Sequence, residues 1–320
     1  MNVCENTIPS RTSIVLRVAQ PTVRLMPRIS GITFIRNGIE RGYPFIECIH
    51  TLARLCDEVI VAVGDSTDGT REAIVAANIA GVRIIDTLWD DTNRSGGSEL
   101  ARQTNIALRH AQFEWCLYLQ SDELIHEEDD TLLRYEIARA DLTPNVEALL
   151  FRWLHFYGNY EYIGVGRQWY RREIRAFRNT GYVFSWRDAQ GFRTYDQRGR
   201  IRKLRARQTD VRIFHYGWVR HPRAMLAKHY AFNRLYHDDQ WLQENIPAKE
   251  EFPNGCYELT RYIGTHPAIM LPRIERDRQW ASHFDPSNRP RKPLLIALSD
   301  WIERHTGVRI GEYRNFIEVK

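Results

Sequence analysis

Strand-like and helix-like segments alternate through residues 29–125, and this alternation restricts the fold more than any other feature of the chain. The strand-like segments are rich in apolar residues and cover residues 29–35, 58–63, 82–85 and 115–119. The segments between them carry apolar residues at helical spacing and cover residues 43–55, 70–78 and 98–110. Buried strands joined by helices form a mostly parallel sheet that is flanked by helices. We therefore predict an α/β fold.

The alternation weakens after Asp122. Further strand candidates are residues 148–156, 173–177 and 211–215, and a segment rich in Gly, Arg and aromatic residues lies between them. Helical spacing returns in residues 222–242 and in an amphipathic stretch around residues 294–305. We therefore expect a C-terminal helical extension.

The composition is that of a globular protein. Of the 320 residues, 43% are apolar and 27% are charged, which excludes a disordered or fibrous chain. No stretch reaches the ~20 continuous apolar residues of a membrane span. Four arginines interrupt residues 1–30, which therefore lack the apolar segment of a signal peptide. The five cysteines have no metal-ligand or redox spacing. We expect a cytoplasmic protein with reduced thiols.

The net charge of +5 is unevenly distributed along the chain. Residues 151–220 carry sixteen Arg and Lys residues against five acidic residues, a net charge of +11. Such a patch can attract nucleic acid, an anionic membrane surface or a phosphorylated small molecule. Arg-rich, solvated faces of strands and loops are the plain alternative.

Two polar segments follow predicted strands, at the sheet edge where open α/β folds bind ligands. In the first, GDSTDGT (residues 64–70), Asp65 and Asp68 could accept hydrogen bonds from a nucleobase or a ribose. The alternative is a turn with a helix cap. In the second, QSDE (residues 120–123), Asp122 could bind a divalent cation that bridges a diphosphate. A cap for the following acidic segment is the alternative there.

Together these segments, in this order, resemble the nucleotide-sugar domain of inverting, GT-A-fold family 2 glycosyltransferases. The resemblance covers residues 29–125 and includes EVIVAVGDSTDGT, the helix with ARQTN and WCLYLQSDE. It implies a GT-A-type, Rossmann-like sheet and transfer of a sugar from a nucleotide-sugar donor to a hydroxyl acceptor. It also implies an N-terminal extension (1–28), a donor half (29–125), an acceptor half of the same domain (126–221) and a C-terminal helical region (222–320).

The resemblance assigns expected roles to individual residues. In such enzymes the first loop acid, here Asp65, contacts the base, and the loop after the first strand, here Arg36-Asn37-Gly38, lines the nucleotide pocket. The family's Asp-x-Asp motif holds ribose and a divalent metal, Mn²⁺ or Mg²⁺. Here Gln120 replaces its first acid and Asp122 is its second, so the chain has one metal ligand fewer.

Residues outside the loops are also expected at the donor site. Arg102 lies on a predicted helix facing this site and could neutralise diphosphate, although an ion pair with Glu99 is the alternative. His215 follows a strand in FHYGWVR and could supply a second metal ligand. A purely structural histidine is the alternative. Lys228 and His229 on the next helix could contact the leaving diphosphate.

An inverting transfer needs a general base opposite the leaving group. Asp188, in SWRDAQGF, is the first candidate, and Glu173 is the reserve. An ion pair of Asp188 with Arg187 or Arg193 is the alternative. Aromatic residues could stack on acceptor sugar rings, although a core sheet would use them too. The acceptor-binding candidates are Trp153, Tyr157 and Trp186.

The expected partners are a nucleotide-sugar donor and a saccharide or lipid-linked acceptor of cell-surface polysaccharide, without nucleic acid. The basic region also suggests peripheral contact with the inner face of a membrane. Two rival functions remain. A nucleotidyltransferase of related fold would usually show a Gly-rich basic loop after the first strand, which FIRNGIERG matches poorly. A non-catalytic protein could bind nucleic acid or membrane through the basic segment alone.

Overall fold

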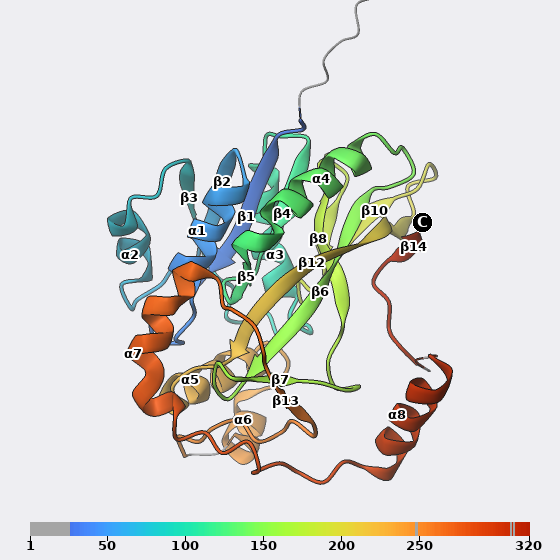
Figure 1. Ribbon diagram of the computed structural model, residues 1–320. Helices are drawn as coiled ribbons and strands as arrows, with labels where there is room; N and C mark the ends of the chain where they lie inside the picture. The colour runs from blue at the N-terminus through green and yellow to red at the C-terminus, as the bar shows by residue number, and fades with distance from the viewer. Residues whose placement is uncertain (1–25, 247–248, 308, 310) are drawn as a thin grey trace, which may run out of the picture.

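The computed structural model describes residues 26–246, 249–307, 309 and 311–320. Residues 1–25 of the expected N-terminal extension therefore lie outside the described residues. Helices pack on both sides of one large sheet (Figure 1). The α/β class predicted from the sequence is confirmed.

Four parallel strands form the first part of the sheet, in the spatial order β3-β2-β1-β4. The strands are β1 (Ile29–Ile35), β2 (Glu58–Val63), β3 (Val82–Asp86) and β4 (Trp115–Tyr118). The connecting helices are α1 (Phe45–Leu55), α2 (Thr70–Ala77) and α3 (Ser98–Arg109). All seven were predicted to within two residues at each end. Because the strands are parallel, their carboxyl ends meet at one edge of the sheet.

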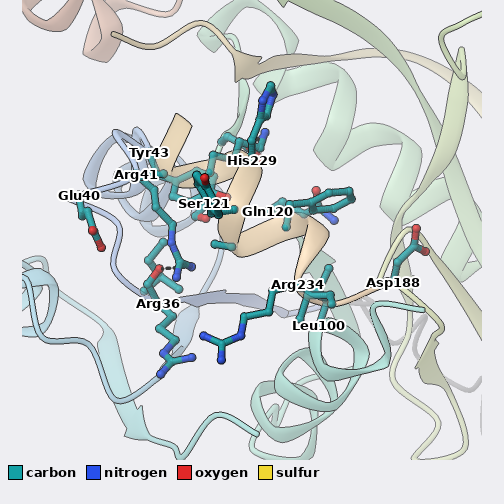
Figure 2. A pocket seen from close by; sticks show the side chains of 18 of the residues that line it. Arg36, Glu40, Arg41, Tyr43, Leu100, Gln120, Ser121, Asp188, His229 and Arg234 are labelled. Carbon is teal, nitrogen blue, oxygen red and sulfur yellow. Dashed lines mark hydrogen bonds and ion pairs between the residues drawn. The ribbon is translucent and has the colours of Figure 1, made fainter. Parts of the chain in front are cut away.

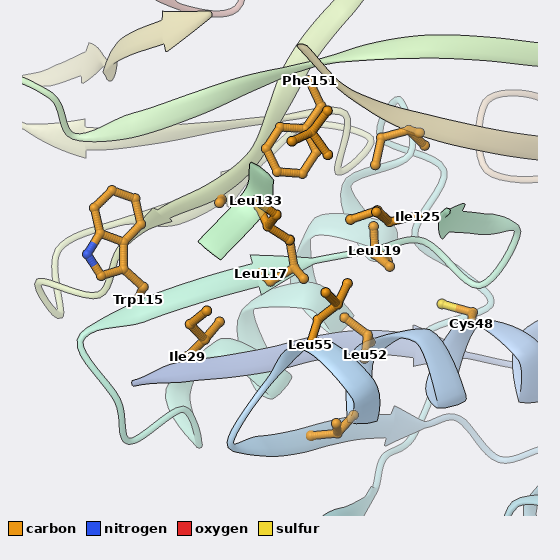
Figure 3. Packing of buried hydrophobic residues seen from close by; sticks show 14 of the residues in the cluster. Ile29, Cys48, Leu52, Leu55, Trp115, Leu117, Leu119, Ile125, Leu133 and Phe151 are labelled. Atoms are coloured by element: carbon orange, nitrogen blue, oxygen red, sulfur yellow. The ribbon is translucent and has the colours of Figure 1, made fainter. Parts of the chain in front are cut away.

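Side chains of these strands alternate between two buried faces, as the period of a strand requires. Val59 and Val61 of β2 belong to the apolar cluster beneath α1, whereas Ile60 belongs to the cluster beneath α3. Figure 3 shows the first cluster, in which Leu52 of α1 lies near Leu117 of β4. Burial on both faces explains why these strands read as continuous apolar runs.

The second half of the chain extends the sheet beyond β4 with mixed strand directions. β8 runs antiparallel to β4 and to β6, β12 runs parallel to β6, and β5 pairs antiparallel with β12. The register of β12 sets His215 opposite both His155 and Glu123. These strands are β5 (Glu123–Ile125), β6 (Ala148–Tyr157), β8 (Arg172–Arg178) and β12 (Arg205–Trp218).

Shorter strands and the remaining helices complete the fold. The short strands are β7 (Tyr162–Gly164), β9 (Phe184–Trp186), β10 (Gly191–Tyr195), β11 (Ile201–Lys203), β13 (Leu259–Arg261) and β14 (Ile317–Val319). Of these, β9, β10 and β11 form a separate sheet. The helices are α4 (Asp130–Asp141), α5 (Pro222–Asn233), α6 (Asp239–Asn245), α7 (Leu271–Ala281) and α8 (Leu294–Thr306), with 3₁₀ turns at Glu127–Asp129 and Ala268–Met270. Among the described helices, none has the length and apolarity that crossing a bilayer requires.

Candidate active site at the carboxyl edge of the sheet

A cavity of about 990 Å³ lies at the carboxyl ends of β1 and β4 (Figure 2). The segments after β1 and β4 form one wall, and α5 and α6 cover it. Asp188 lies on the opposite side from Arg36 and Arg41. Seven of the residues expected at the site line this cavity: Arg36, Gln120, Asp122, Asp188, His215, Lys228 and His229.

The turn that carries Asp122 is fixed by its neighbour Glu123. The Glu123 carboxylate accepts a hydrogen bond from the backbone N–H of Gln120 at 3.0 Å and two from the Arg175 guanidinium at 2.7 Å each. Glu123 and Arg175 are both fully buried, and Arg175 also lies over the rings of Trp153 and Tyr118. Glu123 is therefore an internal anchor, which leaves Asp122 to face the cavity.

Asp122 is a buried carboxylate beside two cationic side chains and an imidazole. Its oxygens lie 3.5 Å from the Arg220 guanidinium, 3.7 Å from Lys228 Nζ and 3.9 Å from His215 Nε2. Burial alone would raise the pKa of Asp122, but His215, Lys228 and Arg220 lower it below its usual value. The carboxylate is therefore ionised at neutral pH.

Arg220 and Lys228 are held in place by backbone carbonyls. Arg220 donates to the carbonyls of Arg41 and Gly217 at 2.6 and 2.8 Å, and Lys228 donates to the Gly217 carbonyl at 2.6 Å. Burial, together with the nearby Arg220, lowers the pKa of Lys228 to about 7. Both side chains therefore lie preorganised beside Asp122, where a polyanionic ligand would favour the protonated form of Lys228.

A hydrogen-bonded chain orients the His215 imidazole. His155 Nε2 lies 2.8 Å from the Tyr170 carbonyl, which can only accept, so this nitrogen carries the proton. Burial lowers the pKa of both histidines, so both are neutral. His155 Nδ1 is then the acceptor for His215 Nδ1–H at 2.9 Å. This assignment leaves the lone pair of His215 Nε2 on the side of Asp122.

The space between His215 and Asp122 suits a small cation. A methyl group at Gly217 would overlap the His215 ring and lie 3.0 Å from Asp122 Oδ2, so the glycine keeps this space open. The donors are one carboxylate and one imidazole nitrogen whose other nitrogen is hydrogen-bonded, as is usual for metal ligands. No group of three or more His, Cys, Asp or Glu side chains within the described residues forms a metal site by itself. A divalent cation here would therefore need oxygen atoms from a bound phosphate or water.

Asp188 projects into the cavity from a strained turn. The residues on either side of it, Arg187 and Ala189, have φ angles of 56° and 60°, a left-handed conformation that is uncommon for residues other than glycine. The Tyr236 side chain lies beside Asp188, and burial, followed by the charge of Asp188, raises the pKa of Tyr236 to about 12. A side chain at Gly97 would overlap both residues. Strain of this kind is commonly found at functional sites.

Arg36, Asn37 and Asp65, which were expected to bind the nucleotide, form contacts between the loop after β1 and the loops after β2 and β3. Arg36 pairs with Asp65 at 3.1 Å and with Asp91 at 2.6 Å. The side-chain oxygen of Asn37 accepts a hydrogen bond from Thr67 N at 3.1 Å. Asp65 and Asn37 thus lie beside the cavity, not among the residues that line it.

Asp68 and Arg102 have local partners. Asp68 accepts hydrogen bonds from Thr70 N and Glu40 N at 3.0 and 2.8 Å, so it caps α2, and these bonds lower the pKa of Asp68 despite its partial burial. Arg102 pairs with Glu99 at 2.6 Å. Neither residue lines the cavity. The structure thus agrees with the alternative given for each residue, a turn before a helix for Asp68 and an ion pair with Glu99 for Arg102.

Glu173 and two of the three expected acceptor aromatics also lie away from the cavity. Glu173 is buried, accepts a hydrogen bond from Asn315 at 3.1 Å, and burial raises its pKa to about 8. Trp153 packs against Arg175, and Trp186 lies 5.7 Å from Arg193.

The third aromatic, Tyr157, lines a second cavity of about 420 Å³. Its aromatic walls are Tyr157, Trp169, Trp218 and Phe252. Trp218 and His229 line both cavities, so the two adjoin.

Several residues of the first cavity were missed from the sequence. The cations Arg41 and Arg234 belong to no recognised motif. Arg220, which lies 3.5 Å from Asp122 but does not line the cavity, was also missed, although it ends the FHYGWVR segment that drew attention to His215. Trp89 and Asp91 come from the loop after β3, whose acidic and turn-forming composition gave no specific signal.

Comparisons with known proteins give partial structural matches only. No protein-family model matches the chain, and no curated protein matches it. One matching structure is a fragment of S. aureus TarS in complex with UDP, with 24% identity, a TM-score of 0.32, and coverage of 44% of this chain and 38% of that chain.

Two further matches have similar extent. The mannosyltransferase PcManGT from Pyrobaculum calidifontis, in complex with GDP-Man and Mn²⁺, has 25% identity, a TM-score of 0.30, and coverage of 41% of this chain and 36% of that chain. Glucosyl-3-phosphoglycerate synthase from Mycobacterium tuberculosis has 18% identity, a TM-score of 0.27, and coverage of 41% and 43%. The chain thus spans less than half the length of these proteins.

Proposed function

We propose that the chain is a metal-assisted glycosyltransferase that moves a sugar from a nucleotide-sugar donor to a hydroxyl group of a glycan or glycolipid, with inversion. The observation that carries the proposal is that one cavity is lined both by an ionised Asp122 beside a His215 lone pair and by a second carboxylate, Asp188. A donor with its diphosphate beside Asp122 would then expose its anomeric carbon to Asp188.

The diphosphate is assigned to the cationic part of the cavity. Arg220 and Lys228 lie within 4 Å of Asp122, and Arg41 and Arg234 face the same space. Asp122 and His215 would hold the divalent cation, which supplies Lewis-acid stabilisation of the leaving group when it is bound. The nucleoside would lie towards Arg36, whose guanidinium is 5.5 Å from the Trp89 ring.

Asp188 is assigned as the general base. The acceptor oxygen attacks the anomeric carbon, the bond from that carbon to the phosphate oxygen breaks, and the nucleoside diphosphate leaves with the electron pair. Asp188 takes the proton from the acceptor hydroxyl. The neighbouring Tyr236 side chain is assigned to position the carboxylate before the reaction.

The second cavity is assigned to the acceptor. Its aromatic side chains suit the apolar CH faces of sugar rings. Because Trp218 and His229 line both cavities, an acceptor bound there would lie next to the donor sugar.

A thermal-shift panel tests the donor site. UDP, GDP, CDP and dTDP are each added with Mn²⁺, Mg²⁺ or a chelator to the wild type and to Asp122→Asn. We expect one diphosphate to raise Tm only with metal, and the variant to lose that rise. Glu47→Gln is the matched control, because Glu47 is ion-paired with Arg273 and does not line the cavity.

Each arm of this panel addresses a different part of the proposal. If the rise in Tm persists in chelator, the proposed metal requirement is wrong, whereas the proposed donor site stands. No rise with any diphosphate would contradict the proposed function. Transfer to a glycan acceptor is then tested with the nucleotide-sugar of the preferred base.

A further inference from the structure

Helix α8 packs with its acidic face towards the protein. Asp300 is 7% exposed and lies 2.7 Å from Lys292 Nζ. Glu303 lies 2.9 Å from Arg171 and 3.4 Å from Arg167. The polar side of this amphipathic helix is therefore occupied by ion pairs with the rest of the chain.

The apolar face of α8 is turned outward. The exposed fractions are 88% for Leu294, 80% for Leu295, 56% for Leu298 and 57% for Trp301. Residues 294, 298 and 301 follow the i, i+4, i+7 spacing of one helix face. A surface helix of a soluble domain normally has the opposite orientation, and contiguous exposed apolar residues mark an interaction surface.

The surroundings of this face are basic. Arg289 and Arg291, just before the helix, are exposed, and so is His305 near its end, whereas the exposed Arg304 pairs with Glu258 at 3.0 Å. The acids of residues 289–307 are Asp300 and Glu303, and both face the protein. The surface presented to solvent therefore combines Leu and Trp with positive charge.

We propose that α8 docks the protein onto an anionic membrane surface, lying in the plane of the interface. Leucine and tryptophan on one face with flanking arginines are the features of interfacial helices. Anionic lipid headgroups complement the exposed Arg289 and Arg291. At thirteen residues, α8 is ~20 Å long at 1.5 Å per residue, so it suits the interface and is too short to span the bilayer.

The helix also adjoins the second cavity. Arg167, an ion-pair partner of Glu303, immediately precedes Gln168 and Trp169, which line that cavity. Arg309, just beyond the helix, donates to the Trp169 carbonyl at 2.9 Å. Docking through α8 would thus bring the proposed acceptor cavity close to the lipid surface. The docking surface itself does not depend on the proposed function.

Vesicle flotation of the full chain tests the docking. Vesicles of phosphatidylcholine alone are compared with vesicles containing 30% phosphatidylglycerol. We expect at least tenfold stronger partitioning onto the anionic vesicles, weakened by added salt. The double variant Leu294→Ser, Leu298→Ser should lose most of this binding. The matched control is Ile263→Ser, because Ile263 is an exposed apolar residue outside α8.

The outcomes separate the possible occupants of the α8 face. Because both leucines are exposed, the double variant should keep the wild-type Tm and the response to nucleotides, which shows that it is folded. Equal binding of variant and wild type would overturn the proposal. The proposal would also be overturned if the wild type is a dimer in analytical ultracentrifugation, the variant is a monomer, and the wild type does not bind vesicles. A monomer that binds neither vesicle would likewise overturn it.

Discussion

Glu173 provides a sharp test of the interior electrostatics. It is a buried carboxyl whose pKa is raised from 4.5 to about 8 by burial, which outweighs the opposing effect of Arg175. At neutral pH it is therefore protonated in the folded chain and ionised in the unfolded chain. Glu173→Gln replaces the protonated group by a neutral group of the same shape, and its oxygen can still accept from Asn315.

The sign follows from proton counting. Between pH 4.5 and 8 the folded chain binds a proton that the unfolded chain has lost, so Glu173 lowers stability progressively as the pH rises through this window. Each unit of pKa difference is worth about 1.4 kcal/mol. From pH 5.5 to pH 8, the wild type should therefore lose ~3 kcal/mol of unfolding free energy relative to the Gln variant.

Urea denaturation at several pH values measures this difference. The exposed Glu161→Gln is the control, and its curve should run parallel to that of the wild type. If the stability of Glu173→Gln relative to the wild type is the same at pH 5.5 and pH 8, the raised pKa is wrong. The variant should also retain sugar transfer, because Glu173 lies away from the cavity.

Three further changes test the site and its support. Gly217→Ala should abolish the metal-dependent part of the nucleotide thermal shift, because the methyl group overlaps the His215 ring; Gly255→Ala, whose nearest neighbour would be 3.9 Å away, should not. Asp188→Asn should bind the nucleotide as the wild type does but transfer sugar ~10²–10⁴-fold more slowly, and a normal rate would exclude it as the base. Arg175→Met should lower the free energy of unfolding by about 3–5 kcal/mol in urea titrations, because Glu123 is left buried without its partner.

The elements that were predicted correctly from the sequence are those with a strong pattern of apolar residues. Strands β1, β2 and β4 are buried on both faces, so their apolar runs are unmistakable. Strands such as β11 and β13 have no such pattern, because only pairing with neighbouring strands defines them. Helix α4 was missed although Leu133, Ile137 and Ala140 have helical spacing and are buried, so a signal was present there.

The candidate site was predictable where strand ends converge. Asp122 follows β4 at a polar segment that stands out in the sequence, whereas His215, expected just after a strand, lies within the last residues of β12, and the sheet brings the two within 3.9 Å. Arg41 and Arg220 could not be predicted, because their approach depends on how β12 and α5 pack over the loop after β1. Asp68 and Arg102 were expected at the site but do not line the cavity. Their side chains bind partners that are near in the sequence, and the sequence alone does not distinguish such residues from ligand-binding ones.

The neighbouring acids Asp122 and Glu123 separate two kinds of selective pressure. One backbone step apart, they face opposite sides, one towards the cavity and the other towards the buried Arg175. In a saturation-mutagenesis library, the isosteric change Asp122→Asn should reduce the proposed sugar transfer far more than it reduces cellular abundance. Substitutions at Glu123 should reduce abundance itself. Two residues that would look equally intolerant in a growth screen would thus be constrained by chemistry in one case and by folding in the other.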